Sequence, residues 1–372
     1  MATLFYGWRV VGVCFVAAVL TWGFGVFGAS VYLAEVTRAQ SWSVSLVSVA
    51  VTAYYISNAL SLSVIGGAID RFGSRPVFIF GALALGGGVA WIGHVAETWQ
   101  LFGAFIIMGL GYASLSLTSL SATIAPWFER HQGRSVAIAL TGASVGAILI
   151  VPLLVTTIEQ FGFQAALSGG GCLIVALLVP LSLIILRHRN PRDLGLGRDG
   201  DALTETGIGA SKTAPGPHWT RRRAIRSAAL WSISIAFALA LTTQVGFLVH
   251  HLNLAAPVLG VSGAAWLVSV TGMSAFIGRL LLVRIADSIN LRRYTSAILA
   301  TQALVFGLIA IAPGTTTLIC GSLIFGFCQG QITTLSPIIV RREFRAVSYG
   351  AIYGFVATVI QFSSSFGPMR FG

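Results

Sequence analysis

The chain has 372 residues, of which 56% are hydrophobic and only 9% are charged, and its mean hydropathy is +0.86. Soluble domains carry roughly 25% charged residues, so this composition excludes an ordinary soluble enzyme and indicates a protein that lies in lipid. The formal net charge of +12 is typical of nucleic-acid-binding proteins, but the positions of the basic residues along the chain point to a different reason for it.

Eleven apolar stretches are long enough to cross a bilayer, which takes ~20 residues in a helix. We predict helices, because a membrane-spanning strand would show ~10-residue segments of alternating hydrophobicity. The first stretch exceeds the usual apolar length of a cleaved signal peptide, so it stays in the protein. The predicted spans are residues 9–33, 44–69, 76–95, 99–124, 135–158, 163–186, 228–251, 261–285, 294–312, 316–339 and 348–368.

The basic residues follow the topology of these spans. Of 23 Lys and Arg residues, 20 lie at the amino terminus or in connections that follow even-numbered spans. Arg38 and Arg370 lie on the other side, and Arg279 lies within a span. This is the positive-inside pattern, so we predict a cytoplasmic (inner) membrane protein that crosses the bilayer many times and has its amino terminus in the cytoplasm, and we expect no nucleic-acid partner.

One long polar segment divides the spans into six and five. Residues 187–227 are rich in Gly, Pro, Ser, Thr and charge and are predicted to form a flexible cytoplasmic linker. Residues 1–186 are predicted to form an N-terminal six-helix bundle, and residues 228–372 a C-terminal bundle of five helices in which a sixth is missing.

The two halves repeat several features at a nearly constant distance along the chain, 217 residues for two of the pairs and 214 for the third. Such offsets indicate a duplicated helical unit, which is typical of secondary transporters that bind substrate near the membrane midplane between two halves. The repeated pairs are Asp70 and Asp287, Gly109 and Gly326, and Glu129 and Glu343.

The stretch "GGAIDRFGSR", residues 66–75, resembles the signature of the major facilitator superfamily between helices 2 and 3. It departs from that signature at Ser74, and an eroded second copy follows the eighth span. The resemblance implies an all-α major facilitator fold of two six-helix bundles, here with the last helix missing and eleven helices predicted. The matching residues are Gly66, Asp70, Arg71, Gly73 and Arg75, with Asp287 and Arg292 in the second copy.

These residues are predicted to form a gating motif. Glycines allow a sharp turn, and the Asp70 carboxylate can pair with arginines or with the amino end of a helix in the other bundle. Such a contact would form in one transport state and open in the other. The alternative is that Arg71 and Arg75 only keep this loop in the cytoplasm.

Four further stretches resemble the monocarboxylate transporter and oxalate:formate antiporter group: "YGWRVV", "RNPRDLGL", "QVGFLVHHL" and "GRLLLVRIAD". Members of that group carry small organic anions and place an arginine in helix 8 against the substrate carboxylate, a position that Arg279 occupies here. A guanidinium pairs with a carboxylate through two parallel hydrogen bonds. The alternative is that Arg279, about 9 Å from the end of its span, reaches the membrane surface or braces the loop.

Uncharged polar residues within the spans are predicted to complete the substrate site. Each of them could instead join two helices by a hydrogen bond. They are Tyr54, Tyr55, Asn58, Tyr112, Gln244, Gln329 and Tyr353.

The coupling mechanism stays open. No Asp or Glu lies within a predicted span, whereas His250 and His251 are predicted to end helix 7 on the outer side, where a proton role competes with simple anchoring. Symport with protons, exchange and facilitated diffusion are all retained.

The sequence therefore predicts a monomeric secondary transporter for a small organic anion, by resemblance a mono- or dicarboxylate, in contact with membrane lipids. We expect no catalysed reaction, cofactor or metal. Two alternatives are retained: an efflux transporter for hydrophobic or cationic compounds, and a membrane sensor or binding protein that does not transport.

Overall fold

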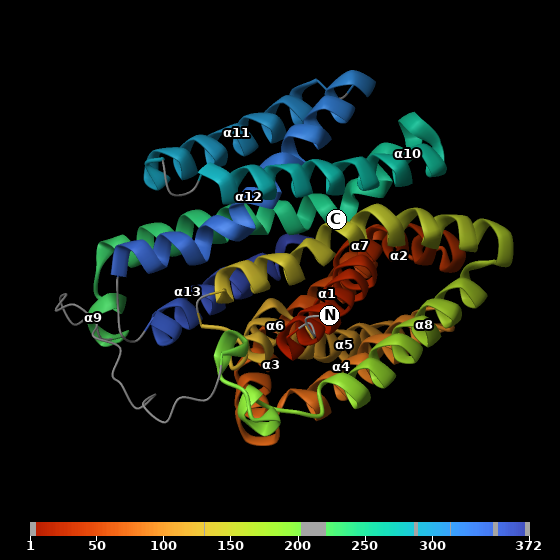
Figure 1. Cartoon of the computed structure of the whole chain (residues 1–372). Coiled ribbons are helices and arrows are strands. Elements are labelled where there is room, and N and C mark those ends of the chain that lie inside the picture. Colours follow the sequence, from red (N-terminus) through yellow and green to blue (C-terminus); the bar gives the residue numbers. More distant parts are fainter. Residues whose placement is uncertain are drawn as a thin grey trace. The chain divides into compact units, whose positions relative to one another are not determined.

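The computed structural model describes residues 5–129, 131–201, 221–285, 289–312, 314–344 and 349–368. Within these residues every regular element is a helix, as predicted (Figure 1). The chain forms two compact units, unit 1 from Met1 to Ala210 and unit 2 from Ser211 to Gly372. Their boundary lies inside the segment 187–227.

Unit 1 begins with one continuous helical stretch whose middle is a π-helix. In chain order, unit 1 contains α1 (Tyr6–Leu20), the π-helix η1 (Thr21–Phe27), α2 (Gly28–Gln40), α3 (Val44–Phe72), α4 (Ser74–Ile92), α5 (Thr98–Ser114), α6 (Leu117–Ile124), α7 (Gln132–Phe161) and α8 (Phe163–Ile185). Helix α4 packs against both α5 and α8, while α1 packs against α7. Helices α2 and α7 extend beyond the predicted ends of their spans and include Glu35 and Glu159.

Unit 2 contains α9 (Arg221–Ile225), α10 (Ala228–Ile285), α11 (Leu291–Ile311), α12 (Thr315–Phe344) and α13 (Tyr349–Ser364). Helix α10 packs against α12 and α13. The core between these helices is formed by apolar side chains such as Phe237, Ile332 and Phe344.

Helix α10 is two membrane-crossing segments rather than one. Its 58 residues would reach about 87 Å as a single straight helix, far more than the ~30 Å apolar thickness of a bilayer. At Gly260 the backbone leaves the helical region, with φ 71° and ψ 167°. The turn between the seventh and eighth predicted spans therefore lies at Gly260.

The described residues contain nine helices that are long and apolar enough to cross a membrane, when α10 is counted once. A shorter apolar stretch, Phe355–Ser364, lies in α13. The total of eleven spans stays a prediction.

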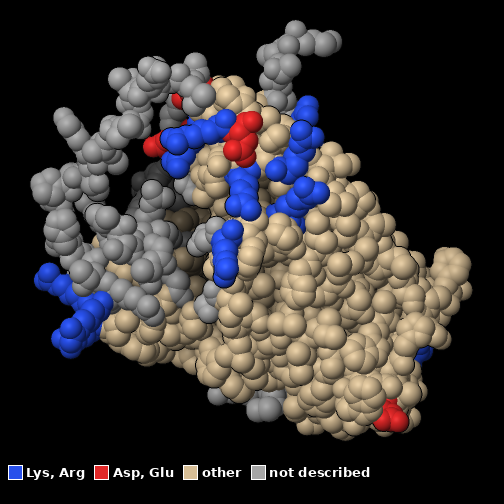
Figure 2. Space-filling view, turned by 90° about the horizontal axis from the view of Figure 1, so that it is seen from below, with Lys and Arg blue, Asp and Glu red and all other residues tan. Residues whose placement is uncertain are grey.

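The surface of both units is apolar in the way that lipid contact requires. Large apolar side chains are exposed in unit 1, such as Val64 and Leu149, and in unit 2, such as Trp266 and Ile311. Figure 2 shows a broad part of the visible face without any charged side chain. Soluble monomers rarely expose apolar areas of this extent, so the multi-pass membrane prediction is confirmed by the fold.

The two units repeat one hydrogen bond between helices. The Ser57 hydroxyl on α3 donates to the Ile106 carbonyl on α5 over 2.9 Å. In unit 2, Ser274 on α10 donates to the Leu323 carbonyl on α12 over 2.7 Å. Donor and acceptor both lie 217 residues after their counterparts. This contact supports the duplication that the sequence offset predicts.

The segment after α8 differs from the flexible linker predicted there. It forms two short 3-10 helices, Pro191–Leu194 and Arg198–Gly200. The Asp199 carboxylate is 3% exposed and accepts hydrogen bonds from the backbone N–H of Glu129 over 3.0 Å and of His131 over 3.3 Å. Because Asp199 satisfies the backbone at the α6–α7 connection, residues 187–201 fold onto unit 1.

Candidate functional site

Arg279 lies in the second apolar segment of α10, six residues before the helix ends at Ile285. The side chain is half-buried, and its Nη2 donates to the Thr333 hydroxyl of α12 over 3.4 Å. Thr333 in turn donates to the carbonyl oxygen of Gln329, one turn earlier on the same face. We name Arg279, Gln329 and Thr333 the Arg279 cluster.

Close packing of α10 against α12 holds the cluster together. A Cβ atom at Gly330 would lie within 2 Å of the Ala275 carbonyl oxygen, so the two backbones approach more closely than any larger residue would allow. The side-chain oxygen of Gln329 is buried and has no hydrogen-bond partner among the described residues. The structure thus joins Arg279 to Thr333, which sequence analysis missed, and places Gln329 one turn before Thr333 on α12.

A second group of predicted residues gathers inside unit 1. The ring of Tyr54 lies 4.7 Å from that of Tyr55 and 5.6 Å from that of Tyr112, in edge-to-face geometry. Asn58 follows one turn after Tyr54 on α3 and is 1% exposed. We name Tyr32, Tyr54, Tyr55, Asn58 and Tyr112 the tyrosine cluster, because Tyr32 of α2 shares the properties described next.

Several polar atoms of the tyrosine cluster are buried without a partner. Among the described residues, no hydrogen bond satisfies the hydroxyls of Tyr32, Tyr54 and Tyr55 or the side-chain oxygen of Asn58. Leaving a buried polar group unsatisfied costs about 1–3 kcal/mol, and most such groups in proteins have a partner. The cluster is therefore suited to bind water or a ligand that offers hydrogen-bonding atoms.

The π-helix η1 lies beside this cluster. A Cβ atom at Gly25 would lie 2.7 Å from the Tyr54 hydroxyl, and the ring of Trp22 lies 5.6 Å from that of Tyr112. π-Helical turns are rare and occur frequently at functional sites. Sequence analysis missed both η1 and Tyr32; the glycines of "TWGFGVFG" are the only signal that pointed to close contact there.

Two predicted site residues lie outside these clusters. The Gln244 amide nitrogen donates to the side-chain oxygen of Gln302 on α11 over 2.6 Å, in a buried pair. Tyr353 of α13 is half-buried and packs against the apolar core of unit 2. The geometry of Gln244 favours the helix-joining alternative over substrate contact.

His250 and His251 do not end a helix, because α10 continues to the break at Gly260. Both are buried: a ring nitrogen of His250 lies 3.0 Å from the Pro368 carbonyl oxygen, and one of His251 lies 2.9 Å from the Ser322 hydroxyl. The predicted location at the outer end of helix 7 is therefore wrong. The polarity of this pair does not mark a helix end, because each ring makes a hydrogen bond inside unit 2, while Nδ1 of His251 is buried without a partner among the described residues.

Glu35 was also missed, because the first span was predicted to end at residue 33. Its side chain is 11% exposed, and it pairs with Arg38 over 2.5 Å. Among the described residues, no group of three or more His, Cys, Asp or Glu side chains could hold a metal ion.

The predicted gating motif forms the turn between α3 and α4. Gly73 ends α3 and precedes α4 with φ 86° and ψ 170°, a conformation that is essentially restricted to glycine. Arg71 and Arg75 are exposed, and a Cβ atom added at Gly66 would meet no other atom within 4 Å. Asp70 lies in the last turn of α3, and its side chain is outside the described part.

The second copy of the motif is described only in part. Asp287 lies outside the described residues. Arg292, in the first turn of α11, forms an ion pair with Glu343 at the end of α12 over 2.5 Å. This pair joins two helices of unit 2.

Comparison with known sequences places the chain in a family. The profile of the Major Facilitator Superfamily matches residues 13–368. Monocarboxylate transporter 12 of Rattus norvegicus is 23% identical over 393 aligned positions, which cover 94% of this chain and 76% of that protein.

Two further relatives match over shorter regions. An uncharacterized MFS-type transporter of Bacillus subtilis is 26% identical over 39% of this chain, and the fujikurins efflux protein of Gibberella fujikuroi is 30% identical over 38%. The chain covers 36% and 31% of the length of these two relatives.

The fold has counterparts among solved structures. A bacterial homolog of the human lysosomal transporter Spinster, in an inward-facing and occupied conformation, aligns with a TM-score of 0.71 and 14% identity over 99% of this chain and 82% of that one. At this identity the likeness concerns the fold alone. With the profile matching nearly the whole chain, the protein belongs to the Major Facilitator Superfamily of membrane transporters.

Proposed function

We propose that this transporter moves a small organic anion, a mono- or dicarboxylate, across the cytoplasmic membrane by alternating access. The observation that carries the proposal is Arg279, a guanidinium within an apolar membrane helix beside the polar side chain of Thr333. A charged residue within a membrane helix is costly, by up to about 2.5–3.5 kcal/mol at the helix centre, and such residues commonly mark a substrate or ion path.

We take Arg279 as a substrate contact rather than as a structural brace. Its hydrogen bond to Thr333 measures 3.4 Å, longer than the usual 2.7–3.2 Å, so this bond by itself is weak. The close backbone contact at Gly330 already holds these helices together. A carboxylate would accept two parallel hydrogen bonds from the guanidinium.

Taken by itself, the tyrosine cluster is proposed as a polar and aromatic binding region within unit 1. Its unsatisfied hydroxyls can donate hydrogen bonds to substrate oxygen atoms, and its rings can pack against an apolar part. The likeness to monocarboxylate transporter 12 over most of the chain supports the same substrate class.

A second candidate is efflux of uncharged aromatic compounds. The observation that favours it is the tyrosine cluster itself, which contains no charged side chain and has Trp22 beside it. One of the relatives is a fujikurins efflux protein. Under this candidate Arg279 would not contact the substrate.

The proposed orientation puts the amino terminus in the cytoplasm, because 20 of the 23 basic residues fall on that side of the predicted spans. We propose a monomer as the working unit. Protons are retained as one candidate coupling ion.

Counterflow in vesicles tests the proposal. Purified protein is reconstituted into liposomes loaded with unlabelled mono- or dicarboxylates, and uptake of the labelled compound is followed. We expect saturable counterflow with at least one carboxylate and none with uncharged aromatic compounds. Counterflow with the aromatic compounds alone would favour the efflux candidate. Substrate binding without any counterflow would indicate a binding protein.

A further inference from the structure

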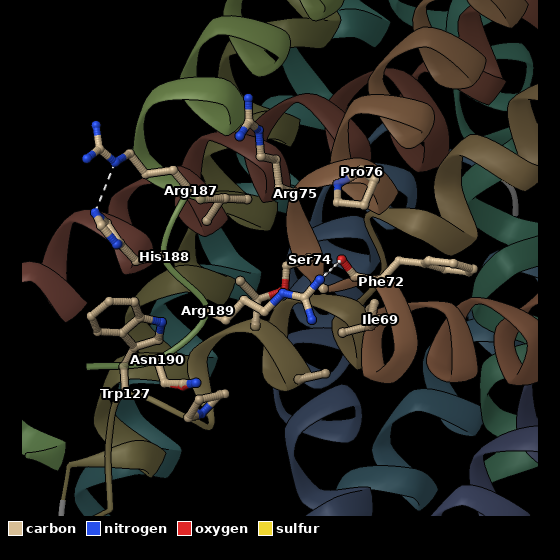
Figure 3. Close-up of a pocket in the computed structure, with 15 residues that line it drawn as sticks. Ile69, Phe72, Ser74, Arg75, Pro76, Trp127, Arg187, His188, Arg189 and Asn190 are labelled. Carbon is tan, nitrogen blue, oxygen red and sulfur yellow. Dashed lines mark hydrogen bonds between the residues drawn. The ribbon is translucent and has the colours of Figure 1, made fainter. Parts of the chain in front are cut away.

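A pocket of about 380 Å³ lies in unit 1 where α3 ends and α4 begins (Figure 3). Four stretches of chain form its walls: the α3–α4 turn, the end of α6, the connection that follows α6, and the segment after α8. The pocket is separate from the Arg279 cluster, which belongs to unit 2, and shares no residue with the tyrosine cluster.

The lining of the pocket is strongly basic. Arg75, Arg187, His188 and Arg189 all line it, and none of the 15 described lining residues is acidic. A carboxylate lies nearby on Asp193, which accepts hydrogen bonds from the backbone N–H of Arg189 over 2.8 Å and of Asn190 over 3.2 Å. The described lining therefore combines three permanent positive charges and contains no acidic side chain.

Hydrogen bonds hold two of the lining arginines in place. Arg189 crosses from the segment after α8 to the α3–α4 turn, where its Nη2 donates to the Phe72 carbonyl oxygen over 2.7 Å (Figure 3). Arg187 donates from Nε to His188 over 3.0 Å.

Aromatic contacts support the part of the wall that Trp127 and His188 form. The ring of Tyr6 lies 5.3 Å from that of Trp127 and 5.5 Å from that of His188. The Tyr6 hydroxyl donates to the Ile185 carbonyl oxygen at the end of α8 over 2.9 Å. These contacts set the position of His188 among α1, the α6–α7 connection and the segment after α8.

We propose that this pocket binds a phosphate group, carried either by an anionic lipid headgroup or by a small phosphorylated solute. Arginine matches phosphate oxygens with two parallel hydrogen bonds, and several arginines together neutralise the one or two negative charges of a phosphate ester. Ser74 and Thr123, whose hydroxyls lie 2.8 Å apart at the pocket, add uncharged hydrogen-bonding groups. The volume falls within the range of small-molecule sites.

The surroundings of the pocket suit a lipid as the source of the phosphate. Phe72 in the lining is 54% exposed, and Val64, two turns earlier on α3, is 70% exposed, so apolar surface continues from the pocket along the helix. The pocket also lies at helix ends that the basic residues assign to the cytoplasmic leaflet, where anionic lipids attract basic groups. Acyl chains could then lie along α3 while the phosphate meets the arginines. This inference does not depend on the transported substrate.

Calorimetry on the purified full-length chain in neutral detergent tests the site. The probes are dioctanoyl phosphatidylglycerol, dioctanoyl phosphatidylcholine as the zwitterionic comparison, and glycerol 3-phosphate and inorganic phosphate as soluble sources. Arg187→Gln removes one lining charge, and Arg75→Gln combined with Arg187→Gln removes two. Arg222→Gln is the matched control, because Arg222 is exposed in unit 2 and outside the pocket. Arg189 is left intact because it holds the Phe72 carbonyl.

We expect phosphatidylglycerol to bind more tightly than phosphatidylcholine. Each removed charge is expected to weaken binding about 5-fold, so the double variant loses about 25-fold. Arg187→Lys keeps most of the affinity, and Arg222→Gln binds like wild type. Raising the salt concentration weakens binding, because the lining arginines are exposed.

The outcomes separate the two sources and can overturn the proposal. Tight binding of phosphatidylglycerol with weak binding of the soluble phosphates assigns the site to lipid. Tight binding of glycerol 3-phosphate or inorganic phosphate that is lost in the same variants assigns it to a solute. The proposal would be overturned if the double variant bound phosphatidylglycerol and the soluble phosphates with the same affinities as wild type and Arg222→Gln. The absence of binding with every probe would also overturn it. If the double variant does not purify as a folded monomer, the 5-fold change in Arg187→Gln decides.

Discussion

Gly326 of α12 packs against the backbone of Thr271 on α10 so closely that a Cβ atom at residue 326 would lie 2.3 Å from the Thr271 carbonyl oxygen. In unit 1, Gly109 and Tyr54 make the same contact, with 2.4 Å between a Cβ atom and the carbonyl oxygen. Both residues of the second pair precede their counterparts by 217 positions. The duplicated sequence therefore repeats one specific helix crossing, at which glycine is required by distance alone.

We predict that Gly326→Ala destabilises the protein. The added methyl group forces α10 and α12 apart, and overpacking of this kind costs about 1–3 kcal/mol, or roughly 1–4 °C in melting temperature. Gly307→Ala on α11 is the control, because no atom lies within 4 Å of its Cβ position and alanine favours the helix. Thermal unfolding of both variants in detergent checks this, and a wild-type melting temperature for Gly326→Ala would contradict the described crossing.

Gly73 allows a second stability test at the α3–α4 turn. With φ 86° and ψ 170°, any other residue is strained there by about 1–3 kcal/mol, and a Cβ atom would lie 2.9 Å from Arg189 Nε. Gly73→Ala is therefore expected to lower the melting temperature, whereas Gly66→Ala, in the open part of α3, leaves it unchanged or raises it slightly. If both substitutions behave alike, the motif glycine is not required by the turn.

Most helices could be predicted from the sequence because apolar length alone fixes a membrane span. A connection was predicted at residues 252–260, but the position of the turn at Gly260 could not be predicted, since "VLGVSG" is mostly apolar. The predicted end of the seventh span therefore came too early, and His250 and His251 were wrongly placed at the end of a helix. The first span was ended before Glu35, whose charge is compensated by Arg38 one turn later.

Single residues of the candidate site could be predicted from the sequence, but the neighbours that they contact could not. Arg279 stood out because a lone charge inside an apolar run is costly. Its neighbour Thr333 and the partner of Gln244 depend on how α11 and α12 are rotated about their axes, which the sequence does not specify. The π-helix at Thr21–Phe27 shifts the register of the first helix and brings Gly25 against Tyr54, an effect that no periodic pattern predicts.

The Gln244–Gln302 pair tests which polar residues serve packing. Gln244→Ala leaves the buried Gln302 amide without this partner, so we expect a loss of about 1–3 kcal/mol in stability and normal ligand binding per folded molecule. Gln329→Ala is the contrasting variant: it is expected to weaken binding with little loss of stability, because the Gln329 oxygen has no partner to lose among the described residues. The reverse pattern would assign Gln244 to the substrate site.

Asp70 tests the predicted gating role. A residue that biases conformations without touching the ligand changes rates more than affinity. Asp70→Asn is therefore expected to alter the counterflow rate while equilibrium substrate affinity stays within a few-fold of wild type. Unchanged flux at normal expression would leave the motif with a role in topology alone.

Calorimetry on Arg279 variants tests the central proposal most directly. Arg279→Gln removes the proposed charge-assisted pair and is expected to weaken carboxylate binding by about 2–5 kcal/mol, roughly 30-fold or more. Arg279→Lys is expected to keep only part of the wild-type affinity, because lysine lacks the planar guanidinium that forms two parallel hydrogen bonds. Arg284→Gln, an exposed arginine one turn further along α10, should bind like wild type. The measurement is affinity per folded molecule, with the carboxylate that gives the strongest counterflow. Normal affinity in Arg279→Gln would contradict the carboxylate contact and, with it, the proposed organic-anion substrate.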